Sequence, residues 1–446
     1  MNHFQKSRCA TNIRYFKCLL AASMVFSSIT SNAEQSNVEQ VSTESPNFLL
    51  IIADDLGVDA LGSYGISKST AHTPNLDALA KSGVSFDNFW ATPACTTTRG
   101  AIISGQHGYR STIDYVPAVM PSDTKTLQQR LKLADLKQAY VAGIFGKWHL
   151  GGRNPALNHP SEFGVDTYAG NLFNLEDYET WTLTTNGQQS QETGYHTTVV
   201  TDLAIDFIQS NTSGPWFTWV AYSAPHAPFH EPPSNLISSD TSTKRSTDKY
   251  KAMIEAMDTE IGRLIDALPT EDKDNTYIVF MGDNGTPKRM RDQQIFDKEH
   301  VKGSLYEGGI RTPLIIAGAG VDRQGERDSA LVNVTDFFAT FTTLALGYES
   351  TEDVPSNSIS FASLLNNELQ QETSSLREYN YSEWRTRKTD IAWTVRNADY
   401  KVMQHHDGKV TLFASDDLNE TTVLENQLLE DELLSIGKSI RSGQYY

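Results

Sequence analysis

The sequence predicts an α/β fold with a large, mostly parallel β-sheet flanked by helices. Short apolar runs indicate strands at the segment NFLLIIA after Pro46 and at residues 140–145, 216–222, 276–281 and 313–316. Near-continuous apolar runs are typical of strands covered on both faces, as in parallel sheets. Amphipathic segments typical of helices lie between them, at residues 75–82, 126–134, 199–209, 250–268 and 335–346. This alternation is the pattern of an α/β fold.

A different pattern begins at about residue 350. Turn-forming residues at TEDVPSNS precede a predicted helix over residues 361–371. Short strand-like runs separated by turns follow, at residues 391–396, 400–405 and 409–413. These runs predict a small antiparallel sheet, and the end of the chain has the pattern of a helix. We therefore expect a main domain at residues 46–350 and a C-terminal subdomain at residues 351–446.

Residues 1–33 have the plan of a secretory signal peptide. Basic residues without acidic ones precede an apolar run from Cys18 to Ile29, which leads to small residues ending at Ala33. The run is too short to span a bilayer. We expect cleavage after Ala33, a secreted or periplasmic protein, and a disordered polar segment at residues 34–45.

The balance of charge narrows the classes of partner. The chain carries 37 Lys and Arg against 55 Asp and Glu, and the predicted signal peptide contains only basic charges, so the mature chain is more acidic still. This composition argues against nucleic acid and anionic membranes as partners. An anionic substrate therefore requires a site at which basic side chains are concentrated.

Cys95 is the one cysteine outside the predicted signal peptide. It lies in the segment PACTTTRGAIISG, with Arg99 four residues later. A lone cysteine in an exported protein is either an inert buried side chain or a reactive group. The polar motifs elsewhere in the chain favour the reactive interpretation.

Oxygen ligands follow two of the predicted strands. Asp54 and Asp55 end the first, and Asp283 and Asn284 follow the strand at residues 276–281. Taken alone, the aspartate pair is more typical of an acidic turn or cap, and Asn-Gly of a turn. Because parallel strands bring their carboxyl ends to one edge of a sheet, the two motifs together predict a metal site. Carboxylates and an amide select a hard cation, calcium rather than magnesium, because calcium tolerates an irregular oxygen shell.

Basic groups follow other predicted strands. Lys147 and His149 lie two residues apart in GKWHL, His226 is held between prolines in APHAP, and Lys302 lies in the glycine-rich segment HVKGSLYEGGIR. Each residue alone is more often a surface or structural group. Beside metal-binding carboxylates, together they describe a cationic pocket for a tetrahedral oxyanion.

The order of the motifs ADD, CTTTRG with a later SG, GKWHL, APHAP, GDNG and KGSLYEGGIRTP resembles the type I, formylglycine-dependent sulfatases of the alkaline phosphatase-like superfamily. The segment TPNLDALAKSGVSF matches as well. The resemblance covers residues 45–350, with a weaker match to the family's C-terminal subdomain. It implies a sulfatase catalytic domain at residues 46–350 that hydrolyses a sulfated carbohydrate or an aryl sulfate.

The resemblance also implies a cofactor and a modified residue. A maturation enzyme would oxidise Cys95 to formylglycine, whose hydrate is the nucleophile. One calcium ion would be bound by this modified Cys95 together with Asp54, Asp55, Asp283 and Asn284. The family's modification signature has proline, or sometimes alanine, two residues after the cysteine, where this chain has Thr97.

The remaining basic residues take roles by the same resemblance. Arg99 would steady the modified side chain, and Lys147 would contact the sulfate. His149 would be the base near the nucleophile. His226 and Lys302 would lie on the side of the leaving group, where one of them protonates the departing alcohol.

Two alternative functions stay open. A phosphonate monoester or phosphodiester hydrolase could use the same modified residue, and a non-catalytic protein that binds sulfated glycans would result if Cys95 is not converted. The two-metal phosphatases of the superfamily fit less well, because their Asp-His-Gly motif is Asp283-Asn284-Gly285 here, which removes a zinc ligand.

Three long segments are predicted to line the mouth of the pocket, at residues 154–174, 176–194 and 229–247. Within them Tyr178, Trp181 and His230 could contact a sugar or could equally be packing residues.

Overall fold

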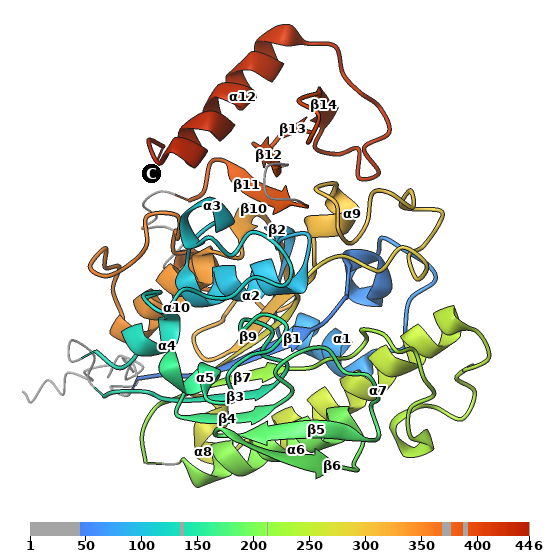
Figure 1. Cartoon of the computed structure of the whole chain (residues 1–446), viewed down its shortest axis with the longest axis vertical. Coiled ribbons are helices and arrows are strands. Elements are labelled where there is room, and N and C mark those ends of the chain that lie inside the picture. The colour runs from blue at the N-terminus through green and yellow to red at the C-terminus, as the bar shows by residue number, and fades with distance from the viewer. Residues whose placement is uncertain (1–44, 134–137, 212, 368–375, 387–390, 446) are drawn as a thin grey trace, which may run out of the picture. The chain divides into compact units, whose positions relative to one another are not determined.

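The centre of the fold is a sheet of ten strands in the spatial order β10-β2-β9-β8-β1-β7-β3-β4-β5-β6 (Figure 1). The computed structural model describes residues 45–133, 138–211, 213–367, 376–386 and 391–445. In chain order the strands are β1 (Asn47–Ala53), β2 (Gly83–Trp90), β3 (Val141–Gly146), β4 (Thr167–Gly170), β5 (Trp181–Thr185), β6 (Gln188–Glu192), β7 (Trp216–Ala221), β8 (Thr276–Gly282), β9 (Leu314–Gly318) and β10 (Glu326–Asn333). Strands β8, β1, β7, β3 and β4 run parallel, whereas β9 and the β5–β6 hairpin are antiparallel to their neighbours. The predicted α/β class is confirmed.

Helices cover both faces of this sheet. The longer ones are α1 (Pro74–Ser82), α2 (Cys95–Ser104), α6 (His196–Ser210), α7 (Ser246–Asp266) and α10 (Asp336–Leu346). Single-turn helices are α3 (Gly108–Ser111), α4 (Leu127–Arg130), α5 (His159–Glu162), α8 (Thr270–Lys273) and α9 (Glu307–Ile310). Helices α1, α6, α7 and α10 match four of the predicted helices to within a few residues.

The two faces of β1 explain this layering. All seven residues of β1 are buried, and successive side chains point to opposite faces. Phe48, Leu50 and Ile52 pack with the apolar residues of α2 and α10, and Leu49 and Ile51 pack with those of α1, α6 and α7. Figure 1 shows these two groups of helices on opposite sides of the sheet. The apolar run that predicted a strand covered on both faces is therefore such a strand.

Two predicted helices are shorter than expected. The helix predicted at residues 126–134 is only the single turn α4, and residue 134 lies outside the described part of the chain; the Leu131 carbonyl accepts from the Tyr140 N–H at 3.0 Å, just before β3. The helix predicted at residues 361–371 is a short 3₁₀ turn at Ala362–Leu364, and residues 368–371 lie outside the described part of the chain.

The C-terminal part contains a second, antiparallel sheet of four strands. Its strands are β11 (Asn380–Arg385), β12 (Ile391–Arg396), β13 (Tyr400–Gln404) and β14 (Val410–Ala414), and helix α12 (Gln427–Ser442) packs on one face (Figure 1). The three predicted strands and the final helix are confirmed, and β11 is an additional strand. Asn380 joins the two sheets by donating to the Val332 carbonyl at 2.9 Å. Residues 44–446 form one compact unit, and the division at residue 350 stays a prediction.

The predicted signal peptide at residues 1–33 lies outside the described residues, as does the predicted disordered segment except for Ser45, which is buried. Among the helices of the described residues, none combines the length and the apolar character that crossing a membrane requires.

Candidate active site

Four adjacent parallel strands end at the same level and place the predicted site residues together. The register pairs Ala53 of β1 with Gly282 of β8, and it pairs Ala221 of β7 with Ile52 of β1 and Gly146 of β3. The residues that follow these strand ends are Asp54 and Asp55, Asp283 and Asn284, Lys147 and His149, and the loop that carries His226. The carboxyl edge of the sheet therefore collects acidic and basic groups from four separate stretches of sequence.

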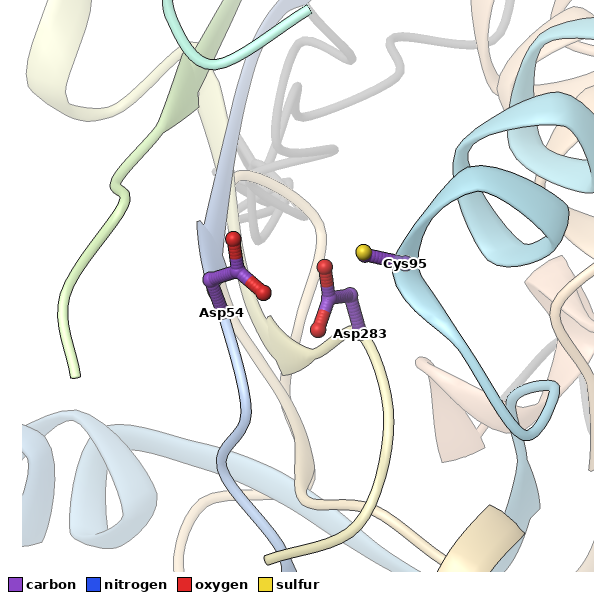
Figure 2. A group of neighbouring side chains, drawn as sticks. All are labelled: Asp54, Cys95 and Asp283. Carbon is purple, nitrogen blue, oxygen red and sulfur yellow. The ribbon is translucent and has the colours of Figure 1, made fainter. Parts of the chain in front are cut away.

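Cys95 completes this cluster from a helix. It is the first residue of α2, and its thiol faces the carboxylates of Asp54 and Asp283 (Figure 2). The ligand atoms of these three residues all lie within 4.8 Å of one another, and all three residues are buried. The structure thus brings together a nucleophile candidate and two carboxylates that are separated by up to about half the chain.

Buried cations lie against these carboxylates. The Lys147 ammonium donates to Asp54, and Nη2 of Arg99 lies 3.0 Å from Oδ2 of Asp283 and 3.8 Å from Oδ2 of Asp54. Burial opposes ionisation of Asp54, but the positive charges around it, Lys147 first, outweigh burial and hold its pKa well below the usual range. Arg99 also donates to the Lys147 carbonyl at 2.6 Å. Arg99 therefore connects Lys147 to Asp283 and fixes both.

Two oxygen atoms of the predicted metal ligands lack a hydrogen-bond donor among the described residues. Oδ1 of Asp54 and Oδ1 of Asn284 are buried and accept no hydrogen bond from any described residue. The Asn284 amide nitrogen donates to Oδ1 of Asp55 at 2.9 Å, which fixes the orientation of the amide oxygen. Burial and the charge of Asp54 raise the pKa of Asp283 to about 7. Unpartnered acceptors beside crowded carboxylates are the environment that a bound cation relieves.

The thiol of Cys95 is neutral in this environment. Its Sγ lies 3.1 Å from Nδ1 of His149 and 3.6 Å from Nζ of Lys147. Burial nevertheless raises the pKa of Cys95 to about 11, because the residue is only 4% exposed and the nearby carboxylates oppose the charge of Lys147. Oγ1 of Thr96 lies 3.2 Å from the same His149 nitrogen, a contact that the sequence motifs did not predict.

His149 is held in a defined position, and its imidazole is neutral. Burial, with the nearby charge of Lys147, lowers its pKa well below the ordinary value. Its backbone has a φ of 62°, and its N–H donates to the Leu172 carbonyl at 3.1 Å. The imidazole packs against Phe173 with ring centroids 4.7 Å apart. The loop after β4 therefore fixes the position of the His149 imidazole.

The turn after β3 depends on a glycine. Gly146 has a φ of +96°, and a Cβ atom there would lie 2.2 Å from the Ala221 carbonyl oxygen. Only glycine combines this backbone conformation with so close an approach. Gly146 thus allows Lys147 to follow β3 at the level where β7 also ends.

His226 and Lys302 lie on the more open side of the cluster, with side chains 20% and 24% exposed. Lys302 donates to Oδ1 of Asp55, and Nε2 of His226 lies 4.0 Å from Oδ2 of the same residue. Nδ1 of His226 donates to the Ala227 carbonyl at 2.7 Å, which leaves Nε2 as the nitrogen that faces the site. Burial lowers the pKa of His226.

A segment of the C-terminal part holds the loop that carries Lys302. Oδ1 of Asn419 accepts from the Asp297 N–H at 2.8 Å, and the Asn419 carbonyl accepts from Nδ1 of His300 at 2.6 Å. The neighbouring Glu420 is buried and lies 2.7 Å from Nζ of Lys401. The sequence motifs did not indicate this support, because it joins residues that are more than a hundred positions apart.

The three aromatic candidates at the pocket mouth have structural contacts. Tyr178 and Trp181 are 2% and 4% exposed, so stacking on a sugar is not available to them and the packing interpretation holds. The Tyr178 hydroxyl lies 2.7 Å from the Ser223 carbonyl and 2.8 Å from the His226 carbonyl, which braces the His226 loop. His230 is partly exposed and lies 3.1 Å from the Tyr195 hydroxyl.

Known proteins are similar to this chain in sequence. The model of the family described as "Sulfatase" matches residues 46–348. Arylsulfatase J of Mus musculus is 28% identical over 337 residues, which cover 70% of this chain and 55% of that protein. N-acetylgalactosamine-6-sulfatase of Homo sapiens is 29% identical over 335 residues, which cover 67% of this chain and 62% of that protein. The chain therefore matches less than two thirds of the length of these curated relatives.

Solved structures share the fold over nearly the whole described chain. The structure of Ps i-CgsB in complex with k-i-k-neocarrahexaose is 26% identical, has a TM-score of 0.74, and aligns over 90% of this chain and 94% of that one. The structure of BT4656 in complex with its substrate D-glucosamine-2-N,6-O-disulfate is 20% identical, has a TM-score of 0.72, and aligns over 90% and 98%. The second likeness shows the fold alone. With the family model extending over all ten strands of the central sheet, the chain belongs to the sulfatase family.

Proposed function

We propose that this protein is a sulfuric ester hydrolase that releases sulfate from a sulfated carbohydrate or an aryl sulfate. The observation that carries this proposal is the cluster at the strand ends, in which Cys95 lies among acidic oxygens and basic nitrogens. Ps i-CgsB was solved in complex with k-i-k-neocarrahexaose, which supports a carbohydrate substrate for the present chain.

The charges of the cluster support a bound divalent cation. Three basic side chains, Arg99, Lys147 and Lys302, face three carboxylates, those of Asp54, Asp55 and Asp283. With the histidines neutral this leaves no net positive charge for an anionic ester. Asp54, Asp55, Asp283 and Asn284 would hold calcium, and their unpartnered oxygens fit a hard cation. Calcium would supply Lewis-acid stabilisation of negative charge on the sulfuryl oxygens.

The neutral state of the Cys95 thiol in the folded chain supports a nucleophile other than the thiol, namely the formylglycine that a maturation enzyme would form from it. A thiol whose pKa is about 11 is a weak nucleophile at neutral pH. The hydrated aldehyde would supply two hydroxyl groups on one carbon, one to attack sulfur and one to expel sulfate as the aldehyde forms again. Nδ1 of His149 lies within hydrogen-bonding reach of this side chain and would accept the proton of the second hydroxyl.

The other basic residues divide the remaining tasks. Lys147 faces both Asp54 and Cys95, so its ammonium would contact the sulfate bound between them. Arg99 is fully buried and acts on its neighbours, holding Lys147 and Asp283. His226 and Lys302 are the partly exposed groups, and one of them would donate the proton to the departing alcohol oxygen.

Export and maturation are part of the proposal. The basic and apolar pattern of residues 1–33 supports secretion or a periplasmic location. The maturation enzyme must accept Thr97 at the position where the family has proline or alanine. In the folded chain the Thr97 hydroxyl donates to the Ala94 carbonyl at 2.8 Å in the first turn of α2.

The proposed function is tested with protein purified from its native host. An aryl sulfate and the matching aryl phosphonate are compared for turnover, and the peptide that contains residue 95 is analysed by mass spectrometry. We expect faster release of sulfate, and aldehyde or hydrate at residue 95. A fully unmodified thiol in active enzyme would refute the mechanism, and preferred turnover of the phosphonate would favour the alternative hydrolase. Binding of sulfated glycans without sulfate release would favour the non-catalytic alternative.

A further inference from the structure

A cavity lies next to the catalytic cluster, on the side of His149. Its volume is about 580 Å³, within the range of small-ligand pockets. Phe173 forms a wall of the cavity and also packs against His149, with ring centroids 4.7 Å apart. The backbone of the same wall pairs with the catalytic loop, because the Asn171 and Leu172 carbonyls accept from the N–H groups of Trp148 and His149. Phe173 therefore contacts both this cavity and His149.

The lining of the cavity is polar, with two acidic side chains against one basic side chain. Amide side chains come from Asn154, Asn174, Gln189 and Gln191, and the acidic side chains of Glu176 and Asp177 oppose the single guanidinium of Arg153. Among the residues that the structure describes, none pairs with the side chains of Asn154, Asn174, Glu176 or Arg153. The cavity therefore presents unused donors and acceptors on a concave surface.

The walls that carry these groups are fixed by other contacts. Nε1 of Trp181 donates to the Gly194 carbonyl at 3.0 Å, and Nε2 of Gln191 donates to the Trp181 carbonyl at 2.8 Å. Oδ1 of Asp177 accepts from the Glu179 and Thr180 N–H groups at 2.7 and 2.8 Å. A preformed wall reduces the ordering that a ligand must impose when it binds.

We propose that this cavity is a subsite for an unsulfated sugar unit next to the sulfated unit of an oligosaccharide. Amide and carboxylate side chains match the paired hydroxyl groups of a pyranose, which both donate and accept hydrogen bonds. The two carboxylates disfavour a second sulfate group at this position. The proposal rests on the proposed function, because the sulfated unit of the same oligosaccharide would occupy the cluster at Cys95.

The test compares a small substrate with an extended one. Asn154→Ala/Asn174→Ala removes two side chains that have no partner in the described residues, so the fold does not depend on them. For the sulfated oligosaccharide that gives the highest kcat/KM in a panel of defined oligosaccharides, we expect KM to rise about tenfold through the lost hydrogen bonds. For an aryl sulfate, which fills only the cluster, kcat/KM stays within about twofold of the parent value.

The control is Ser190→Ala, on the β5–β6 hairpin that carries Gln189 and Gln191. Ser190 points to the opposite face of the hairpin, outside the cavity, so both substrates are expected to behave as with the parent. Equal loss for both substrates in the double variant, or no change for either, would overturn the subsite. If no substrate releases sulfate, the proposed function fails. The subsite is then judged by calorimetric binding of the same oligosaccharide, where unchanged affinity in the double variant overturns it.

Discussion

The sulfur of Cys95 lies 3.1 Å from Nδ1 of His149, although one residue begins a helix and the other follows a strand. The relationship is enforced from the side of His149, where the left-handed backbone, the Leu172 carbonyl and the Phe173 ring leave the imidazole one position. The proposed second half-reaction needs a neutral base in a fixed position beside the side chain at position 95.

His149→Asn is expected to lower kcat for an aryl sulfate by about 10²- to 10⁴-fold, because it removes a proton acceptor. Asparagine tolerates the φ of 62° at this position, so the fold is retained. Steady-state kinetics and thermal unfolding measure the two effects. The matched control is His159→Asn. His159 accepts a hydrogen bond from the indole of Trp148, and its substitution should change kcat only a few-fold. Comparable losses in both variants would remove His149 from the reaction.

Thr97→Pro is expected to raise the fraction of chains that carry formylglycine, because it restores the residue that the family's signature has at this position. Thr97 lies in the first turn of α2, where proline is tolerated. Loss of its hydrogen bond to Ala94 removes about 1 kcal/mol of stability. Mass spectrometry of the residue 95 peptide gives the fraction. Thr97→Ala should also raise it and Thr97→Ser should not; an unchanged fraction with proline contradicts the prediction.

Calcium is expected to raise the thermal midpoint of unfolding, and chelation is expected to abolish sulfate release. At a free concentration of 100 times Kd, a ligand of the folded state adds about 2.7 kcal/mol to the free energy of unfolding. Asp54→Asn should remove this response, since Asp54 lies at the centre of the cluster. Asp87→Asn, at the surface on β2, should retain it. Differential scanning calorimetry with and without calcium measures the shift in the thermal midpoint. An equal shift in both variants would exclude this site as the calcium site.

Acidification below about pH 6.5 is expected to destabilise the fold through His196. Burial lowers the pKa of His196 to about 3 in the folded chain, so between that pH and the ordinary value near 6.5 the unfolded chain binds more protons. The free energy of unfolding therefore falls as pH decreases through this window, by at most about 1.4 kcal/mol per pH unit for one group.

His196→Gln tests this assignment. Glutamine can still donate to Oδ1 of Asn171, which lies 2.8 Å from Nε2 of His196, but it cannot bind a proton. Urea unfolding at several pH values should show a shallower dependence in the variant. An unchanged slope would place the effect on other buried groups.

Asn419→Ala is expected to lower kcat/KM by about five- to tenfold, because it frees the Asp297 N–H and loosens the loop that carries Lys302. Loss of this partly exposed hydrogen bond should lower the free energy of unfolding by only about 1 kcal/mol. A double-mutant cycle with Lys302→Ala separates positioning from general stability. The Asn419 effect should vanish when Lys302 is absent, and full additivity would contradict the positioning role.

The sequence predicted the strands in the middle of the ten-stranded sheet better than those at its two edges. Strand β1 is apolar on both faces, and so it reads as a buried strand without knowledge of its neighbours. Strand β10 (ERDSALVN) begins with mostly exposed polar residues and only its last three residues are continuously buried, so it lacks the apolar run that would have predicted a strand. Strands β5 and β6 meet at Asn186-Gly187, both with positive φ, a hairpin signal that was present in the sequence and was not used.

The candidate site was predictable where the proposed metal ligands directly follow strands. Asp54 and Asp283 were identified because parallel strands align their ends, which sequence order alone implies. Thr96, Phe173 and Asn419 were not identified, since each acts through a partner that only the tertiary fold supplies. The single turn of α4 was also not predicted, and the Leu131 carbonyl after it accepts from the Tyr140 N–H, a contact that the helical pattern does not indicate.

The burial of Cys95 determines whether a second protein must act on this residue before or after the chain folds. The residue is 4% exposed and already part of a helix, so no second protein can bind an extended stretch around it once the sheet has closed over it. Under the proposed function, oxidation of Cys95 to the aldehyde must therefore come before folding is complete. On the same proposal, a chain that folds first would keep its thiol and remain inactive, so the yield of active protein would depend on the rate of oxidation relative to the rate of folding rather than on stability.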